Sequence, residues 1–173
     1  MDTIKITSGI FRGRSIKSPK SNLTHPMGAR EKLALFNMIV DDLPGSLVLD
    51  AFAGSGALGI EALSRGSSGV VFIEKGTSAS KIIRQNLETL GIQAEIFVGD
   101  VVNFAAEQLF DVILADPPYD NFDPKKIINL PKFLKKDGVL ALSHPGEAPE
   151  IPGVKLEKTR KYAQAHISIY KRL

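Results

Sequence analysis

The chain has 173 residues, of which 43% are hydrophobic and 24% are charged, so it is long enough to bury the core of one globular domain. It contains no cysteine, which excludes disulfides, thiolate metal sites, iron–sulfur clusters and cysteine nucleophiles. No uncharged apolar run approaches the roughly 18 residues of a membrane span, and no apolar stretch typical of a signal peptide follows the N-terminus. We therefore expect a cytoplasmic protein without a membrane partner.

The formal net charge of +3 is unevenly distributed. Residues 1–38 contain seven basic and two acidic residues, whereas the rest of the chain is slightly acidic. A basic arm on an acidic body indicates a polyanionic partner, although a solvated basic surface would have the same composition.

The first part of the chain predicts a β-hairpin followed by a helix. Isoleucines favour extended structure in 3–18, and Gly9 and Gly13 provide turns within it. Apolar residues recur every three or four positions over 29–40, which predicts a helix that ends before Pro44.

From residue 47 onward, short apolar runs alternate with helical segments. This pattern predicts a parallel sheet with helices on both faces, whose binding crevice lies beyond the carboxyl ends of the strands. The β-rich C-terminus departs from the alternation and predicts an antiparallel edge pair. The expected strands are 47–52, 70–74, 94–98, 112–115, 139–143, 155–160 and 165–170, and the expected helices are 57–65, 77–90, 102–108 and 123–134.

A glycine-rich turn follows the first of these strands. Gly54, Gly56 and Gly59 match the dinucleotide-binding fingerprint, which on its own also fits a tight turn that binds nothing. Asp50 at the strand tip would repel a pyrophosphate but attract the amine and sulfonium of S-adenosylmethionine, and the helix N-terminus would attract its carboxylate. The turn thus predicts an S-adenosylmethionine site that includes Asp50, Phe52, Ala53, Gly54, Ser55 and Gly56.

Two further strand ends supply acidic residues. Glu74, which precedes Lys75, is placed to accept hydrogen bonds from ribose hydroxyls, unless it is an exposed charge at a strand end. Asp100, which precedes Val101, could bind an adenine amino group or cap the following helix. We interpret these four residues as the rest of the cofactor site.

The fourth strand ends in Asp116, Pro117, Pro118 and Tyr119. The prolines fix the backbone and have no N–H groups, so they leave carbonyl oxygens as acceptors. Methyl transfer to the exocyclic amine of a base requires acceptors for its N–H groups, which the Asp116 carboxylate and Pro117 carbonyl would provide, and Tyr119 would stack on the flipped base. We predict that these four residues form the catalytic loop, rather than a structural turn.

These stretches resemble the class I S-adenosylmethionine-dependent methyltransferases that methylate amines. The segments ITSGIFRGR at 6–14, HPM at 25–27 and VFIEK at 71–75 are similar to the RsmD family, and the resemblance covers nearly the whole chain. The family often has Arg-Pro-Thr in place of the segment at 25–27, Glu in place of Ser143-His144, and Tyr-Gly in place of Tyr162-Ala163. These departures leave the choice of nucleotide open.

The resemblance implies a Rossmann-like fold with a mostly parallel seven-stranded sheet, an antiparallel C-terminal edge and an N-terminal hairpin extension. Residues 1–28 would be the RNA-contacting arm and residues 29–173 the methyltransferase domain. The implied reaction methylates the N2 amine of a guanine in small-subunit (16S) rRNA, as naked RNA or in the assembled small ribosomal subunit, and releases S-adenosylhomocysteine. We expect a monomer without a metal. The residues expected to contact RNA phosphates are Arg12, Arg14, Lys17, Lys20 and Arg30.

Two alternatives remain at this point. An adenine-N6 or cytosine-N4 DNA methyltransferase shares the catalytic loop, but the short chain leaves no room for a separate base-recognition domain. A nicotinamide-dependent oxidoreductase, or a binding module with a vestigial site, would share the glycine-rich turn. Asp50 and the loop that begins at Asp116 disfavour the oxidoreductase and the binding module.

Overall fold

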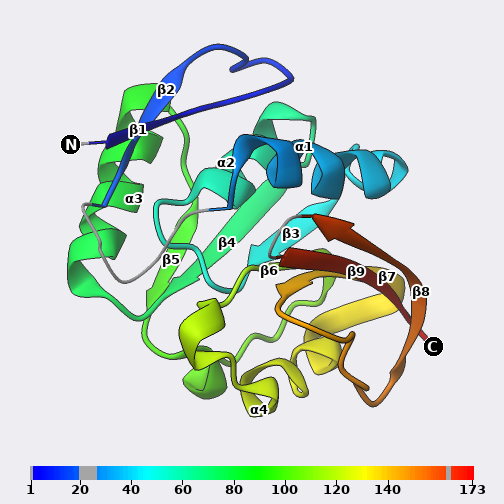
Figure 1. Ribbon diagram of the computed structural model, residues 1–173. Coiled ribbons are helices and arrows are strands. Elements are labelled where there is room, and N and C mark those ends of the chain that lie inside the picture. The colour runs from blue at the N-terminus through cyan, green and yellow to red at the C-terminus, as the bar shows by residue number, and fades with distance from the viewer. Residues whose placement is uncertain (1, 20–26, 163–164) are drawn as a thin grey trace.

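The computed structural model describes residues 2–19, 27–162 and 165–173 (Figure 1). A two-stranded antiparallel sheet pairs β1 (Asp2–Lys5) with β2 (Ser15–Ser18), with Ile4 opposite Ile16, which confirms the predicted hairpin. Within the described residues, no helix is long and apolar enough to cross a membrane.

The main sheet has seven strands in the order β5-β4-β3-β6-β7-β9-β8. Its first five members are parallel, whereas β9 is antiparallel to both β7 and β8, as expected for a parallel sheet with an antiparallel C-terminal edge. The strands are β3 (Leu47–Asp50), β4 (Gly69–Glu74), β5 (Glu95–Val98), β6 (Phe110–Ala115), β7 (Leu134–His144), β8 (Val154–Tyr162) and β9 (Ala165–Arg172).

Apolar side chains on the two faces of this sheet form two cores. One core buries α1 (Ala29–Met38), α2 (Ala57–Ser64) and α3 (Thr77–Leu90), and the hairpin packs on the same side. The other face is covered by the short helix α4 (Pro124–Ile127) and by irregular chain (Figure 1). Helical turns of the 3-10 type occur at Val40–Asp42, Val101–Asn103, Tyr119–Asn121 and Leu130–Phe133.

The prediction of a helix over 102–108 is wrong. Only Val101–Asn103 form a 3-10 turn, and the chain is extended at Phe104. The Phe104 ring packs edge-on against Phe97 and Phe133, at centroid distances of 5.4 and 5.1 Å. Burial of this ring outweighs the local helical propensity, because a continuing helix would turn the ring away from its two partners. The segment predicted over 123–134 is also divided, into α4 and a 3-10 turn.

The hairpin is attached to α3 through Asn86. This buried side chain accepts a hydrogen bond from the Lys17 N–H at 2.8 Å and donates one to the Lys17 carbonyl at 2.9 Å. It also donates to the carbonyl of Ser55 at 3.0 Å, so one side chain links the hairpin to the glycine-rich turn.

A second attachment centres on Glu61 of α2, whose side chain is fully buried. Its carboxylate accepts hydrogen bonds from the Thr7 hydroxyl at 2.6 Å and from the backbone N–H groups of Thr7 and Ser8 at 3.0 Å. It also forms ion pairs with Lys32 at 3.2 Å and Arg65 at 3.0 Å. The loop after β1, helix α1 and helix α2 therefore share one buried charge.

Burial by itself would raise the pKa of Glu61, but the Thr7 and Lys32 contacts lower it below its ordinary value. We expect Glu61→Gln to reduce the free energy of unfolding by about 2–4 kcal/mol at neutral pH, because Lys32 and Arg65 lose their common counter-charge. A lowered carboxyl pKa stabilises the fold above the pKa of the unfolded chain, so the difference should shrink as pH falls below about 4.5. Urea unfolding at several pH values measures this, with the exposed Glu88→Gln as control; equal stability of the two variants would contradict it.

Candidate active site

The acidic residues singled out in the sequence meet at one edge of the sheet. Asp50 and Glu74 are the last residues of β3 and β4, and Asp116 directly follows β6. Strand β3 has β4 on one side and β6 on the other, so the strand order reverses between β3 and β6. Such a switch point in a parallel sheet creates a crevice at the carboxyl ends of the strands.

The turn from β3 to α2 depends on its glycines. Gly54 and Gly56 have φ angles of 55° and 80°, a region that side chains rarely adopt. A Cβ atom on Gly54 would have no heavy atom within 4 Å, so the backbone is open to a ligand there. A Cβ atom on Gly59 would lie 2.4 Å from the Phe72 ring, so this glycine is needed for α2 to pack on β4.

Asp50 lies beneath this turn and is fully buried. Its Oδ2 accepts a hydrogen bond from the Gly59 N–H at 2.9 Å, whereas Oδ1 has no partner among the described residues. Burial raises the pKa of Asp50 to about 7; the Gly59 N–H and, more weakly, the Phe52 N–H lower it, and the negative charges of Asp116 and Glu74 raise it further. A buried oxygen without a donor, in a negative environment, is suited to a cationic group.

Glu74 holds the glycine-rich turn from the neighbouring strand. Its two oxygens accept hydrogen bonds from the Gly54 N–H at 2.7 Å and the Gly76 N–H at 2.6 Å. The side chain is only partly buried, so it lies at the surface of the crevice, and the adjacent Lys75 is exposed. In this arrangement Glu74 positions the backbone of the turn as well as bordering the crevice.

Of the two roles that its sequence position allowed, Asp100 has the capping role in the structure. Its Oδ1 caps the 3-10 turn by accepting from the Val102 N–H at 3.2 Å, and its Oδ2 pairs with Lys126 at 2.6 Å. The hydrogen bond from Lys126 lowers the pKa of Asp100. The Val101 side chain is buried in the second core, so only its backbone is available at the crevice.

The remaining predicted cofactor residues shape the turn through their backbone. The Ala53 N–H donates to the Ile73 carbonyl at 2.9 Å, and the Ser55 carbonyl accepts from Asn86. Both side chains are buried, whereas Phe52 is partly buried against the second core. These contacts connect the turn to β4 and α3.

The predicted catalytic loop leaves β6 at Asp116. Burial raises the pKa of this carboxyl to about 6, although the Ser143 hydroxyl and the Met27 N–H lower it by donating hydrogen bonds. Pro117 is buried and Pro118 partly buried, and Tyr119 begins the 3-10 turn Tyr119–Asn121. The Tyr119 hydroxyl is hydrogen-bonded to Ser143, and burial together with the Asp116 charge raises the Tyr119 pKa to about 12.

Ser143 and Met27 were not predicted as site residues. Ser143 lies near the end of β7, is fully buried, and contacts both Asp116 and Tyr119. The only signal in the sequence was that Ser143 occupies a position where the family tends to have Glu. Met27 lies two residues before α1, so the described residues just before this helix reach the loop that begins at Asp116; His25 and Pro26 lie outside the described residues.

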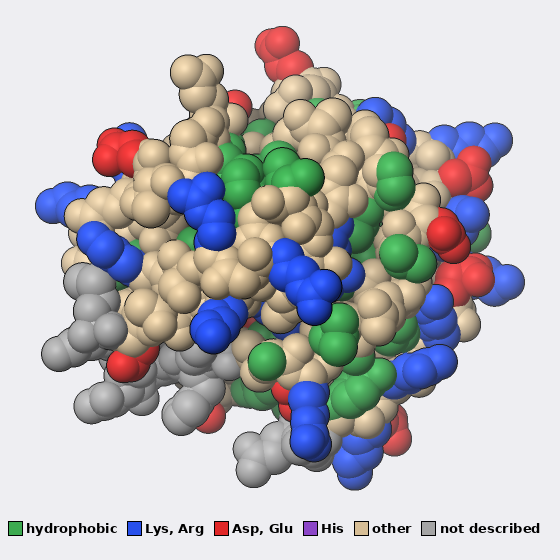
Figure 2. Space-filling view, turned by 90° about the horizontal axis from the view of Figure 1, so that it is seen from above, with side chains coloured by type: hydrophobic (Ala, Val, Ile, Leu, Met, Phe, Trp, Pro, Cys, Tyr) green, Lys and Arg blue, Asp and Glu red, His purple; other side chains and the backbone are tan. Residues whose placement is uncertain are grey.

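The basic residues of the arm lie on the side of the hairpin and α1. Seen from that side, Lys and Arg side chains stand across the middle of the face, and Asp and Glu side chains lie mostly at its rim (Figure 2). Arg12 and Arg30 are exposed, Arg14 donates to the Thr89 carbonyl at 2.9 Å, and the Lys17 ammonium donates to Gln85 at 3.2 Å. Lys20 lies outside the described residues.

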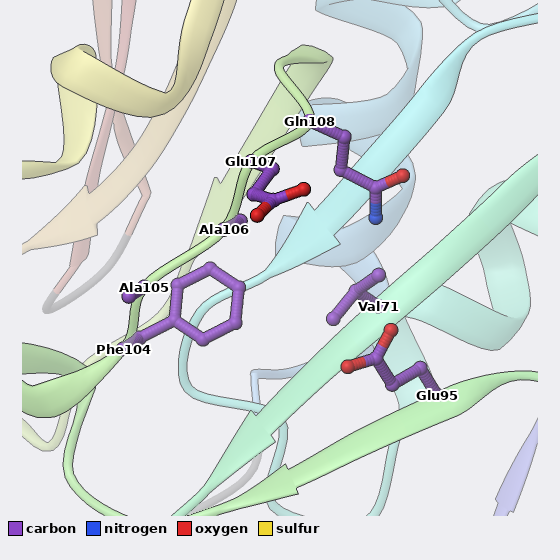
Figure 3. A pocket seen from close by; sticks show the side chains of 7 residues that line it. All are labelled: Val71, Glu95, Phe104, Ala105, Ala106, Glu107 and Gln108. Atoms are coloured by element: carbon purple, nitrogen blue, oxygen red, sulfur yellow. The ribbon is translucent and has the colours of Figure 1, made fainter.

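A hollow of about 430 Å³ lies elsewhere, where the expected helix over 102–108 is missing. Glu95 and Glu107 border it from opposite sides, with the Phe104 ring and Val71 between them (Figure 3). Val71 and Glu95 are paired at the amino end of β5, three residues before the Glu74–Val98 pair at the crevice. None of the predicted site residues lines this hollow, so we do not assign the site to it.

Comparison with known proteins agrees with this architecture. The family model described as conserved hypothetical protein 95 matches residues 4–171. YlbH of Bacillus subtilis, a protein named for rRNA methylation, is 36% identical over 98% of this chain and 99% of its own length. Ribosomal RNA small subunit methyltransferase D of Escherichia coli is 35% identical over 80% of this chain and 70% of its own length.

Solved structures show the same fold. The protein yhhF of Escherichia coli, which is named as a methyltransferase, superposes with a TM-score of 0.89 and 28% identity, over 99% of this chain and 98% of its own. The expectation of a class I methyltransferase fold with an N-terminal hairpin is therefore confirmed. The match over nearly the whole chain and the two named relatives show that this protein belongs to the conserved hypothetical protein 95 family, the RsmD family of rRNA methyltransferases.

Proposed function

We propose that this protein transfers a methyl group from S-adenosylmethionine to the N2 amine of a guanine in small-subunit (16S) rRNA. Methylation of rRNA is supported by the names of its relatives, among them ribosomal RNA small subunit methyltransferase D of Haemophilus influenzae, 37% identical over 67% of this chain. The proteins compared above are named for methyl transfer, which disfavours a nicotinamide-dependent oxidoreductase.

The observation that carries the proposal is the acceptor set at the end of β6. An exocyclic amine has two N–H donors and a lone pair delocalised into the ring. The Asp116 carboxylate and the Pro117 carbonyl would accept these N–H groups and draw the nitrogen toward tetrahedral geometry. A carboxylate has about four acceptor positions, so the hydrogen bonds from Ser143 and Met27 leave Asp116 able to accept another.

The crevice also fits the proposed cofactor. The unpaired Oδ1 of Asp50 would accept from its amine, the open backbone at Gly54 would allow close approach, and Glu74 borders the crevice where a ribose would lie. When bound, S-adenosylmethionine would supply an electrophilic methyl group on its sulfonium and would leave as S-adenosylhomocysteine. Asp116 would be the adjacent acceptor for the proton that the amine releases once its bond to the methyl group has replaced the sulfur–methyl bond.

Methyl transfer from labelled S-adenosylmethionine tests the function. We expect labelled N2-methylguanosine when small ribosomal subunits or naked 16S RNA are offered, and no label in duplex DNA. Asp116→Asn should lower the rate by about 10²–10³-fold, because a developing positive charge loses its carboxylate, while cofactor affinity is retained. The exposed Asp120→Asn in the same loop is the matched control. N6-methyladenine as the product, or an undiminished rate in Asp116→Asn, would contradict the proposal.

The rate should also depend on the ionisation of Asp116. Its pKa of about 6 means that the carboxyl is protonated and loses acceptor capacity at lower pH, so the rate should rise with pH through about 6. Ser143→Ala removes a donor that lowers this pKa, so the midpoint should move to higher pH. A pH profile of kcat measures the shift. Ser168→Ala, a buried serine on β9, is the control and should keep the wild-type midpoint; equal midpoints in all three proteins would show that Ser143 does not position Asp116.

Cofactor binding should release a proton near neutral pH. The raised pKa of Asp50, about 7, leaves it partly protonated in the free protein, and a bound ammonium would lower that pKa. Affinity should therefore increase between about pH 5.5 and 8. Titration calorimetry in buffers of different ionisation enthalpy measures the released proton. Asp50→Asn should bind more weakly and without this proton release; unchanged release in that variant would assign it to another group.

A further inference from the structure

The outer edge of the sheet, strand β8, has a strongly basic surface. Its cations, Lys155, Lys158, Arg160 and Lys161, are all exposed, and Glu157 is the single acidic residue of the strand. The ion pairs found among the described residues involve none of these four cations. Strand β8 lies at the opposite end of the sheet from β5 (Figure 1).

The sheet register places one end of β8 beside the catalytic loop. Arg160 is paired with Ile167 of β9, and Ile167 is paired with Ser143 of β7. Ser143 in turn is hydrogen-bonded to Tyr119, three residues after Asp116. Two strand spacings therefore separate the backbones of Arg160 and Ser143, a distance of about 10 Å. Lys161 follows in the next row, opposite His166.

The position of Arg160 and Lys161 complements that of the hairpin. The hairpin is held on α3, next to the β4 and β5 side of the crevice, whereas β8 is on the far side of β6 and β7. An RNA strand with one base in the crevice must continue in both directions from that base. Basic groups on both sides of Asp116 would thus meet phosphates on both sides of the target nucleotide.

Lysines on an exposed edge strand also prevent sheets from pairing edge to edge. Protection of the edge does not depend on position along the strand, so Lys155 at the far end of β8 would provide it as well as Arg160 or Lys161. Lys158 has a structural contact, because its ammonium donates to the carbonyl of Met38 at the end of α1, at 2.9 Å. Arg160 and Lys161 are the cations of the strand that are paired, through β9, with the end of β7 beside the predicted catalytic loop.

We propose that Arg160 and Lys161 bind backbone phosphates of the RNA substrate on the side of the target nucleotide opposite the hairpin. This inference rests on the proposed function, since it requires RNA to be the substrate.

The test compares two double variants that each remove two positive charges from the same hairpin of strands. Arg160→Gln/Lys161→Gln removes the charges beside the catalytic loop, and Lys155→Gln/Lys171→Gln removes an exposed cross-strand pair at the other end. Binding of naked 16S RNA is measured over a range of salt concentrations, together with cofactor affinity and thermal stability. The methylation assay is run in parallel on naked RNA and on small subunits.

We expect Arg160→Gln/Lys161→Gln to weaken RNA binding about 10-fold and to reduce the slope of log Kd against log salt concentration by about 1.4, since each phosphate contact on a single strand contributes about 0.7. KM for RNA should rise, while cofactor affinity stays at the wild-type value. The Lys155→Gln/Lys171→Gln control should keep the wild-type slope.

Equal losses in both variants would assign the effect to net charge and overturn the inference. A loss seen only with assembled subunits would indicate an acidic ribosomal protein as the partner of β8, and would also overturn it. If the wild-type protein methylates RNA and the first variant matches it in Kd and slope, the inference fails while the proposed function stands. If the wild-type protein methylates no RNA, the proposed function itself fails.

Discussion

The buried carboxylate of Glu61 connects three segments that are far apart in the sequence. A charge without water must be compensated by donors and cations. Those groups come from the loop after β1, from α1 and from the end of α2. Gly59, two residues before Glu61 in the same helix, donates its N–H to Asp50. The arm and the glycine-rich turn are thus fixed to one rigid element, so the position of the hairpin relative to the crevice is set by α2.

Close to α2, the crevice concentrates negative charge without fully compensating it. Asp50, Glu74 and Asp116 converge because their strands are parallel and end at one edge. Burial and mutual repulsion raise the pKa of Asp50 to about 7, and burial raises that of Asp116 to about 6. The proposed cofactor would supply the missing positive charge at Asp50, and the proposed amine would supply donors at Asp116. Both groups would bind where burial disfavours a charged carboxylate.

The antiparallel edge of the sheet places residues of β7, β9 and β8 in one row beside the loop that begins at Asp116. Strand β7 brings Ser143 to Asp116 and Tyr119, and β9 and β8 continue the same row to Arg160. In a purely parallel sheet β9 would run in the other direction, and different residues would occupy this row. The reversal of chain direction at β9 therefore decides which side chains of the C-terminal segment lie near the site.

The sequence by itself determined the alternation of strands and helices, the edge of the sheet at which the candidate site lies, and the acidic residues and prolines at that edge. These features are local, because apolar periodicity, glycine turns and strand-end positions are read over a few consecutive residues. Only the tertiary structure decided that Phe104 ends a helix after one turn, that Glu61 anchors the arm, and that Ser143 holds Asp116 and Tyr119. Each of these depends on contacts between segments distant in the chain. Burial of a ring, a charge or a hydroxyl against such a partner outweighs the local preference, and the sequence pattern near the residue does not encode that partner.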